Sequence, residues 1–305
     1  MAKNEKKAKF GEIAQVWLAS KKGEVKASSY ATYNLLLNEK ILPKISGKKM
    51  KKLCKREFIE QLANEFLEEG YAKDTVENII GIVKSIVIYY KGTIEGVAVL
   101  VDKSKTDDGK DSSMARKIIA KAKRDKEHTN YRNLGILIVM YTGITISELC
   151  ALKWKNIHYE EGFITINEAV SRISIVEDKR TELVIQEANV KRDIPIHSQL
   201  ARAMKPYLDA GVEDDHYVLT NNAQIIEPRT FQNHIKTFCK SFDKTYTASD
   251  MREMFIVTLL RKGVSIAVVA EIAGTTLQHI CNTYGEFISV SSKDKIKEMK
   301  KFSTY

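Results

Sequence analysis

Cysteine is scarce in this sequence, and its few residues lie too far apart to build a metal site or a disulfide framework. Among 305 residues there are four, Cys54, Cys150, Cys239 and Cys281. None belongs to a CxxC pair or lies with a histidine at the spacing of metal ligands, which argues against the common zinc motifs and against a set of disulfides. We therefore predict reduced thiols and no metal site.

Long apolar segments are lacking as well. The most apolar run, 134-LGILIVMYTGI-144, is shorter than the roughly 20 residues that cross a bilayer. The first 17 residues, MAKNEKKAKFGEIAQVW, carry charge but no apolar stretch of the kind found in signal peptides. We expect no membrane anchoring and no export, and therefore a cytoplasmic protein.

Positive charge, by contrast, is in excess. The sequence holds 49 Lys and Arg against 39 Asp and Glu, a formal net charge of 49 − 39 = +10. This favours an anionic partner, and nucleic acid more than a membrane surface, although excess lysine is also common on surfaces that contact only water. Residues 1–100 carry 18 − 12 = +6 of the total, which is more than their share.

One polar segment divides the chain. Residues 101-VDKSKTDDGKDSS-113 contain no aromatic or branched apolar residue after Val101, which is typical of a linker. We predict a first domain of residues 1–100, a linker of residues 101–113 and a second domain of residues 114–305. In the first domain, apolar residues recur at three- and four-residue spacing, with Ser28 or Ser29 and Asp74 as expected N-caps. The helices predicted there span residues 10–20, 28–45, 55–70 and 73–92.

A cluster of cations lies between two of these helices, in residues 43-PKISGKKMKKLCKR-56. Clustered cations neutralise phosphate charge without sequence-specific geometry. We predict that this segment contacts a nucleic-acid backbone; the competing interpretation is a loop that faces only water. We predict that six cations make these contacts, and we call them together the basic loop: Lys48, Lys49, Lys51, Lys52, Lys55 and Arg56.

The second domain has helices at both ends and short strands between them. Helical periodicity is found in residues 114–126, 131–143 and 146–157, and helices resume at Ser198. The intervening β-branched or alternating runs, residues 162–170, 182–189 and 192–196, predict a small antiparallel sheet. The predicted fold class is mainly α, with this sheet inserted in the second domain.

Four segments of the second domain follow one another in an order that resembles the tyrosine recombinase (phage integrase) family, in the branch typified by integrases of conjugative transposons and temperate phages. They are 141-YTGITISELCALKWKNI-157, 191-KRDIPIH-197, 217-YVLTNNAQIIEPRTFQNHIKTF-238 and 247-TASDMREMFIVTLLRKGVSIAVVAEIAGTTLQHICNTY-284. The segment 28-SSYATYNLLLNEKILPKI-45 is similar to the family's core-binding domain. The resemblance implies a two-domain integrase fold that clamps double-stranded DNA.

The resemblance also implies a chemistry. In this family a tyrosine attacks a DNA phosphodiester, forms a 3′-phosphotyrosyl link and releases a 5′ hydroxyl, and no metal, nucleotide or other cofactor is consumed. Two arginines hold the phosphoryl oxygens, while a lysine and histidines assist proton transfer and positioning. In related recombinases a C-terminal tail packs on a neighbouring protomer, so we expect residues 285–305 to support self-association on DNA; packing within the same protomer is the alternative. A partner recombinase is a further expectation.

The family's residue set is only partly present. Tyr284, ten residues after Gly274, matches the nucleophile, and Arg252 matches the second arginine. Thr145 stands at the arginine of TGxRxxE, and Ser249 stands at the histidine of HxxR.

Two further positions of the set are also affected. Thr275 replaces the histidine or tryptophan that usually follows the glycine. The lysine of the β-hairpin is unresolved: Lys191 is the better candidate and Lys179 the weaker one, because the segment 185-IQEANVKR-192 looks shortened.

Several interpretations therefore stay open. The chain is a recombinase with impaired strand cleavage, a catalytically inactive integrase-derived accessory or regulatory DNA-binding protein, or a helical protein-interaction module with chance motif matches. Tyr284 could be a core tyrosine and Arg252 a surface ion-pair partner. His279 could replace the missing acid, but its five-residue spacing from Tyr284 does not place the two side chains on one helix face.

Overall fold

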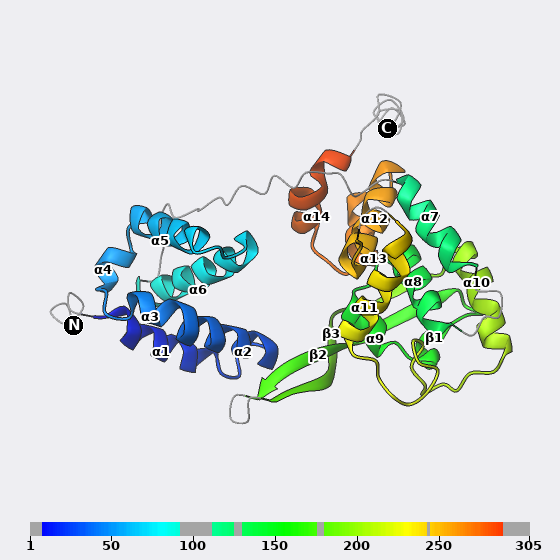
Figure 1. Cartoon of the computed structure of the whole chain (residues 1–305), viewed down its shortest axis with the longest axis horizontal. Helices are drawn as coiled ribbons and strands as arrows, with labels where there is room; N and C mark the ends of the chain where they lie inside the picture. Colours follow the sequence, from blue (N-terminus) through cyan, green and yellow to red (C-terminus); the bar gives the residue numbers. More distant parts are fainter. Residues whose placement is uncertain (1–7, 92–111, 125–129, 176–179, 243–244, 289–305) are drawn as a thin grey trace, which may run out of the picture. The chain divides into compact units, whose positions relative to one another are not determined.

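The chain forms two compact units (Figure 1). The computed structural model describes residues 8–91, 112–124, 130–175, 180–242 and 245–288. One unit comprises residues 1–105 and 172–182, and the other comprises residues 106–171 and 183–305. The predicted linker lies outside the described residues except for Ser112 and Ser113, which begin helix α7 (Ser112–Ala122). The domain boundaries drawn from the sequence therefore stay a prediction.

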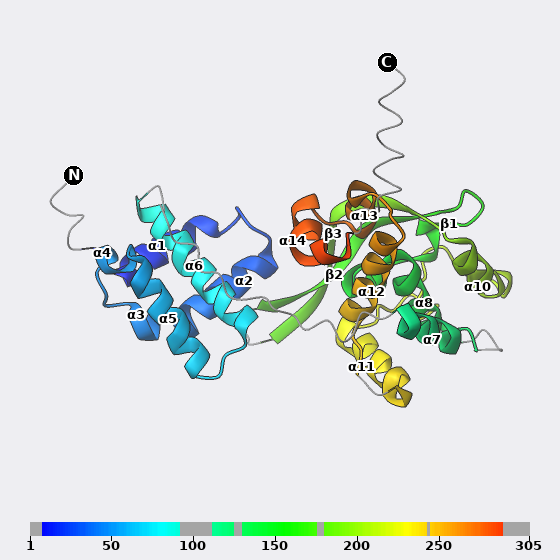
Figure 2. The same ribbon diagram turned by 90° about the horizontal axis from the view of Figure 1, so that it is seen from above.

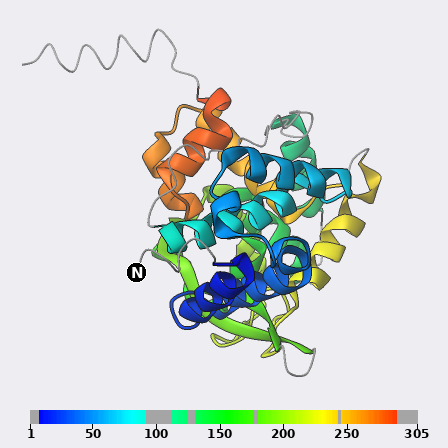
Figure 3. The same ribbon diagram turned by 90° about the vertical axis from the view of Figure 1, so that its left-hand side faces the viewer.

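The first unit is helical. Its long helices α1 (Phe10–Lys21) and α2 (Ala27–Leu36) lie together, as do α5 (Arg56–Glu68) and α6 (Lys73–Lys91) (Figure 3). The short helices α3 (Leu42–Ile45) and α4 (Met50–Leu53) connect the two pairs. Its core consists of side chains from all of these helices except α2, among them Phe10, Trp17, Met50, Phe66 and Ile79.

The predicted N-caps in this unit are wrong. Helix α2 begins at Ala27, so Ser28 and Ser29 lie inside its first turn, and the N-cap Lys26 makes no side-chain capping bond. Asp74 likewise lies inside the first turn of α6. Each helix therefore begins one or two residues before the residue that was predicted to cap it. A π-helical turn, Leu37–Ile41, joins α2 to α3 just before Pro43, whose missing N–H prevents regular α-helical bonding there.

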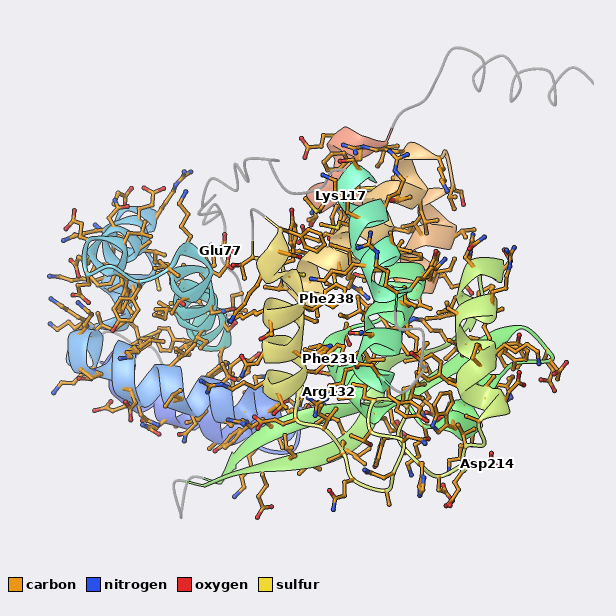
Figure 4. The ribbon with its side chains drawn as sticks, turned by 45° about the vertical axis from the view of Figure 1, so that its right-hand side comes forward. Glu77, Lys117, Arg132, Asp214, Phe231 and Phe238 are labelled. Carbon is orange, nitrogen blue, oxygen red and sulfur yellow. The ribbon has the colours of Figure 1, made fainter. Side chains whose placement is uncertain are left out.

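The second unit is built around helix α8 (Tyr131–Thr142). This helix contains most of the apolar run noted above, and eight of its twelve residues are buried. Helices α7, α9 (Ile146–Ala151), α10 (Ser198–Asp209), α11 (Pro228–Phe238) and α12 (Ala248–Arg261) all contact it. In Figure 4, Phe231 and Phe238 lie between α11 and α8, where they are part of the main core.

A sheet of three strands in the order β1–β2–β3 lies mostly in the same unit (Figure 2), although residues 172–175 of β2 and 180–182 of β3 are counted with the first unit. Strand β1 (Ile157–His158) is antiparallel to β2 (Phe163–Ile175), with Ile157 opposite Ile164. The predicted class, mainly α with a small antiparallel sheet, is confirmed. Strand β3 (Arg180–Pro195) merges two predicted strands into one long strand, so the segment 185–192 is not a shortened hairpin.

The helix predicted at residues 146–157 is also shorter in the structure. It ends at Ala151, and a 3-10 turn, Trp154–Asn156, leads into β1. Within the described part of the chain, no helix is long and apolar enough to cross a membrane.

Helices α12, α13 (Ile266–Ala273) and α14 (Leu277–Tyr284) form a second, smaller core in this unit. It contains Ile256, Val257 and Leu260 from α12, Val269 from α13, and Ile280 and Tyr284 from α14. One part of α12 therefore packs in the main core, and another part supports the helix that ends at Tyr284.

Candidate active site

The site is organised around the sharp connection between α8 and α9. Gly143 ends α8 in the left-handed region, with φ +66°. A Cβ on Gly143 would lie 2.3 Å from the ring of Phe255, so the position requires glycine both for its backbone angle and for the close approach of α12. The connection is thereby held against the helix that carries Arg252.

Thr145 has a structural role in this connection. Its hydroxyl accepts a hydrogen bond from the Glu148 amide at 3.2 Å, and its own amide donates to Glu148 Oε2 at 2.8 Å. The two bonds form a capping box that starts α9. The side chain at the position of the family's first arginine is thus engaged in holding a helix end.

Arg252 reaches this connection from α12. Its Nη1 donates a hydrogen bond to the carbonyl of Gly143. Burial lowers the pKa of Arg252. The negative charge of Glu148 opposes this decrease, whereas the nearby positive charge of Arg192 adds to it. The phenol of Tyr284 also interacts electrostatically with the guanidinium. Arg252 and Tyr284 are therefore close enough to interact electrostatically, and their joint role in cleavage stays a prediction.

Arg192 and Glu148 form a buried ion pair beside them. The Nη1 of Arg192 lies 2.7 Å from Glu148 Oε1, and its Nη2 lies 3.2 Å from Oε2. Only 3% of the Arg192 side chain and 8% of the Glu148 side chain are exposed. Burial by itself would raise the pKa of Glu148, but the hydrogen bonds and charge of Arg192 outweigh it and lower that pKa.

Tyr284 is buried, with 4% of its surface exposed, and its ring belongs to the smaller core. Burial raises the pKa of its phenol to about 12; the negative charge of Glu253 adds to the rise, and Arg252 opposes it. A phenol in this state is a poor nucleophile, because attack needs the phenolate.

The other two substituted positions lie on elements of the same site. Ser249 is exposed on α12, one turn before Arg252. Thr275 is half-buried and follows Gly274, which ends α13; its amide donates to the carbonyl of Ala270 at 2.9 Å. Neither side chain supplies a charge or an imidazole.

Lys191 is placed away from these groups. Neighbouring residues of a strand point to opposite faces, and Arg192 points into the interior, so Lys191 faces the other way. It is exposed, and its Nζ lies 2.8 Å from Glu187 Oε1. Lys191 as the hairpin lysine stays a prediction without support from this geometry, and Lys179 lies outside the described residues.

His279 lies closer to Tyr284 than the spacing predicted. The two ring centroids are 6.1 Å apart, with an interplanar angle of 83°. At the end of α14 the backbone of Tyr284 leaves helical geometry, with φ −124° and ψ 14°, and this change allows the ring to approach. The two rings are therefore in edge contact despite their five-residue spacing, although His279 itself is exposed.

In the first unit, every residue of the basic loop is exposed. Contrary to the prediction, the segment is not a loop throughout, because Lys51 and Lys52 lie in the short helix α4 and Arg56 begins α5. The backbone there is held by short pairing with the start of α1: the Phe10 amide donates to Lys48 O, and the Met50 amide donates to Ala8 O. This pairing brings Lys9 opposite Lys49. Within the described ranges, Lys48, Lys49, Lys51 and Lys52 make no ion pair, so their charges are available to a partner.

Sequence reasoning missed Arg192, Glu148 and Lys9 as members of these two sites. A signal for the first two was present, since Glu148 ends the motif 142-TGITISE-148 and Arg192 opens the strand-like run RDIPI. In the residues with described structure, no group of three or more His, Cys, Asp or Glu is placed to hold a metal ion.

Sequence comparison decides the family. Residues 111–286 match the profile described as the phage integrase family, and residues 9–69 match the phage integrase N-terminal SAM-like domain. The chain belongs to the phage integrase family. Among curated proteins, the integrase chain is 24% identical to tyrosine recombinase XerA of Pyrococcus furiosus over 244 residues, which cover 69% of this chain and 76% of that protein. A tyrosine recombinase of Thermosipho africanus is 24% identical over 179 residues, or 56% of its length.

Solved structures share the fold of this integrase family member. The Tn1549 transposon integrase in complex with a circular intermediate DNA superposes with a TM-score of 0.73 at 17% identity, covering 96% of this chain and 99% of the other. A lambda integrase dimer bound to a COC′ core site gives a TM-score of 0.61 at 15% identity, covering 91% and 94%. Both similarities support the predicted two-domain integrase fold.

Proposed function

We propose that this integrase-family protein binds duplex DNA in site-specific recombination or integration, and that strand cleavage by Tyr284 is impaired. The observation that carries the proposal is that two residues of the family's catalytic set are present while three others are replaced. Arg252 and Tyr284 stand at matching positions of the family's set and interact electrostatically, whereas Thr145, Ser249 and Thr275 are uncharged where the family has an arginine, a histidine, and a histidine or tryptophan.

Magnitudes favour impaired cleavage over intact cleavage. Loss of one preorganised donor costs about 10²–10³ in rate, and general acid–base assistance supplies about 10²–10⁴. The raised pKa of Tyr284 adds a further cost, because burial and Glu253 both disfavour its phenolate. DNA affinity rests on many dispersed cations, so binding should persist where cutting is slow.

The first test is covalent trapping on nicked suicide duplexes from candidate sites. We expect a slow accumulation of protein–DNA adduct on a denaturing gel, and its complete loss in Tyr284→Phe. Tyr207→Phe is a matched control, because Tyr207 is also 4% exposed but lies in the main core. An adduct that survives Tyr284→Phe would assign the chemistry to another residue.

A second function is favoured by the burial of Tyr284 in an apolar core. In this alternative the chain is a catalytically inactive accessory or regulatory DNA-binding protein. It predicts tight binding of the same duplexes with no adduct at any time or enzyme concentration. Failure to bind duplex DNA even at low salt would instead favour a protein-interaction module and would contradict both proposals.

We also propose that the protein self-associates on DNA, with its C-terminal tail supporting assembly, and that a partner recombinase and a mobile genetic element are involved. Support comes from the related lambda integrase, whose structures include a dimer on a core site and a tetramer on a Holliday junction. Association with DNA would place the protein in the nucleoid.

The tail can be tested by truncation. Residues 289–305 lie outside the described residues, whereas Phe287 is buried in the smaller core, so the cut belongs after Ile288. Removal of residues 289–305 is expected to lower the number of protomers per duplex, measured as the native mass of the complex. An unchanged mass would remove the tail from assembly.

A further inference from the structure

The Glu148–Arg192 pair joins three elements that are far apart in the sequence. Glu148 lies in α9, Arg192 in β3, and the Nε of Arg192 donates to the carbonyl of Ile272 in the last turn of α13 at 2.8 Å. Its Nη1 also donates to Val190 O at 3.1 Å. Four of the five guanidinium N–H groups are thus used within the protein, so Arg192 is not free to hold a phosphate in place of the missing arginine.

The contact with α13 is close and specific. A Cβ on Gly274 would lie 2.4 Å from Nη1 of Arg192, so the guanidinium packs directly on the backbone of that glycine. The carbonyl of Ile272 is among the last four of its helix, which lack partners inside the helix. A cation at this end also interacts favourably with the helix dipole. The guanidinium of Arg192 therefore fixes the C-terminal end of α13 at Ile272 and Gly274.

The segment held in this way leads straight to the candidate nucleophile. Gly274 and Thr275 connect α13 to α14, and α14 ends at Tyr284. On the opposite side of the pair, Glu148 is bound by the amide of Thr145, two residues after the carbonyl that holds Arg252. Arg252, through Gly143, and the end of α13, through Arg192 and Glu148, are thus both bonded to the connection between α8 and α9.

We propose that the Glu148–Arg192 pair is a positioning device that fixes the end of α13, and through it α14 and Tyr284, relative to Arg252. A role in stability alone is a weaker explanation, because buried ion pairs are often replaceable by apolar residues without loss of stability. Its functional consequence rests on the proposed strand cleavage, whereas the positioning itself can be measured without it.

The test replaces both charges together, with Glu148→Met and Arg192→Met in one full-length protein. Similar volume without an unpaired charge should keep the fold. Hydrogen exchange followed by mass spectrometry is expected to show amides of residues 272–284 exchanging at least about tenfold faster, with α8 unchanged. Adduct yield on the suicide duplex is expected to fall about ten- to hundredfold, since misplacement by 1 Å costs up to about 10²-fold, while DNA affinity stays within about twofold.

Two glycine variants provide a matched test that leaves both charges in place. Gly274→Ala should push Arg192 away from Ile272 and reproduce faster exchange in residues 272–284. Gly263→Ala is the control, because Gly263 has a similar φ of +76° but no atom within 4 Å of its Cβ position. Both alanines carry the same backbone strain, and only one meets Arg192.

The outcomes separate the two proposals. Unchanged exchange in residues 272–284 of the folded double variant, faster exchange spread evenly over the second unit, or equal effects of the two glycine variants would each overturn the positioning role. Absence of any adduct from the wild type would contradict the proposed cleavage, while the exchange measurement would still decide the role of the pair.

Discussion

Restoring the three substituted side chains is expected to raise the rate of adduct formation by Tyr284 on the order of 10⁴-fold. The triple variant is Thr145→Arg, Ser249→His and Thr275→His, and it supplies the donors that a phosphoryl transition state needs beside the retained Arg252. The factor combines about 10²–10³ for a charged donor with about 10²–10⁴ for acid–base assistance, reduced because such effects are not additive. Adduct yield against time on one suicide duplex measures it.

This restoration has a structural cost. Thr145→Arg removes the hydroxyl that caps α9, at a cost of about 1 kcal/mol in the free energy of unfolding. Thr145→Ala is the matched control, because it loses the cap without adding charge, and urea denaturation of both variants separates stability from chemistry. Adding Tyr284→Phe to the triple variant should abolish the gain. A wild type that already cleaves rapidly, and is slowed by the three changes, would show that the site stabilises its transition state in another way.

The second large effect is expected in DNA binding by the first unit. Replacing four lysines of the basic loop with alanine removes four exposed cations that lack ion pairs in the described structure. Because the slope of log affinity against log salt is about −0.9 per phosphate contact, it should become shallower by about 3.6. When salt is raised from 50 to 200 mM, the fold-loss of affinity of the wild type should therefore be about a hundred times larger than that of the variant. Fluorescence anisotropy on a labelled duplex measures both. The four residues are Lys48, Lys49, Lys51 and Lys52.

A charge-matched variant controls for the general effect of net charge. It replaces four other exposed lysines of the same unit, for which we expect a smaller change in slope: Lys22, Lys26, Lys73 and Lys91. Weakening should also be similar across unrelated DNA sequences, because phosphate contacts carry no base information. Equal slopes for the two variants would remove the basic loop as a specific contact.

The parts of the fold and site that follow short-range patterns could be predicted from the sequence. The mainly α class and the helices with strong apolar periodicity were predictable, because they depend on spacing within one segment. The assignment of Arg252 and Tyr284 as site residues came from the resemblance to the family, and their roles stay a prediction. The capping box at Thr145 could also have been found, since 145-TISE-148 has the pattern of Ser or Thr followed three residues later by Glu.

Other features depend on long-range packing and could not be predicted in this way. Arg192 and Glu148 are 44 residues apart and meet only because β3 returns beside α9. Their neighbour Lys191 looked equally suitable as a functional cation, and only the register of the strand decides which of the two points inward. The approach of His279 to Tyr284 depends on the backbone leaving helical geometry at the last residue of α14, which no periodic pattern records.

The smaller core has a mechanical consequence for the tyrosine. Helices α13 and α14 pack mainly on one end of α12 and not in the main core, so the bonds of Arg192 to Ile272 and Glu148 tie this block to β3 and α9. His279, Thr283 and Tyr284 belong to one helix, so an error in the placement of α13 would displace all three together and preserve their mutual geometry. A substitution that loosens this tie should therefore change how the phenol approaches a phosphate while the main core around α8 keeps its packing.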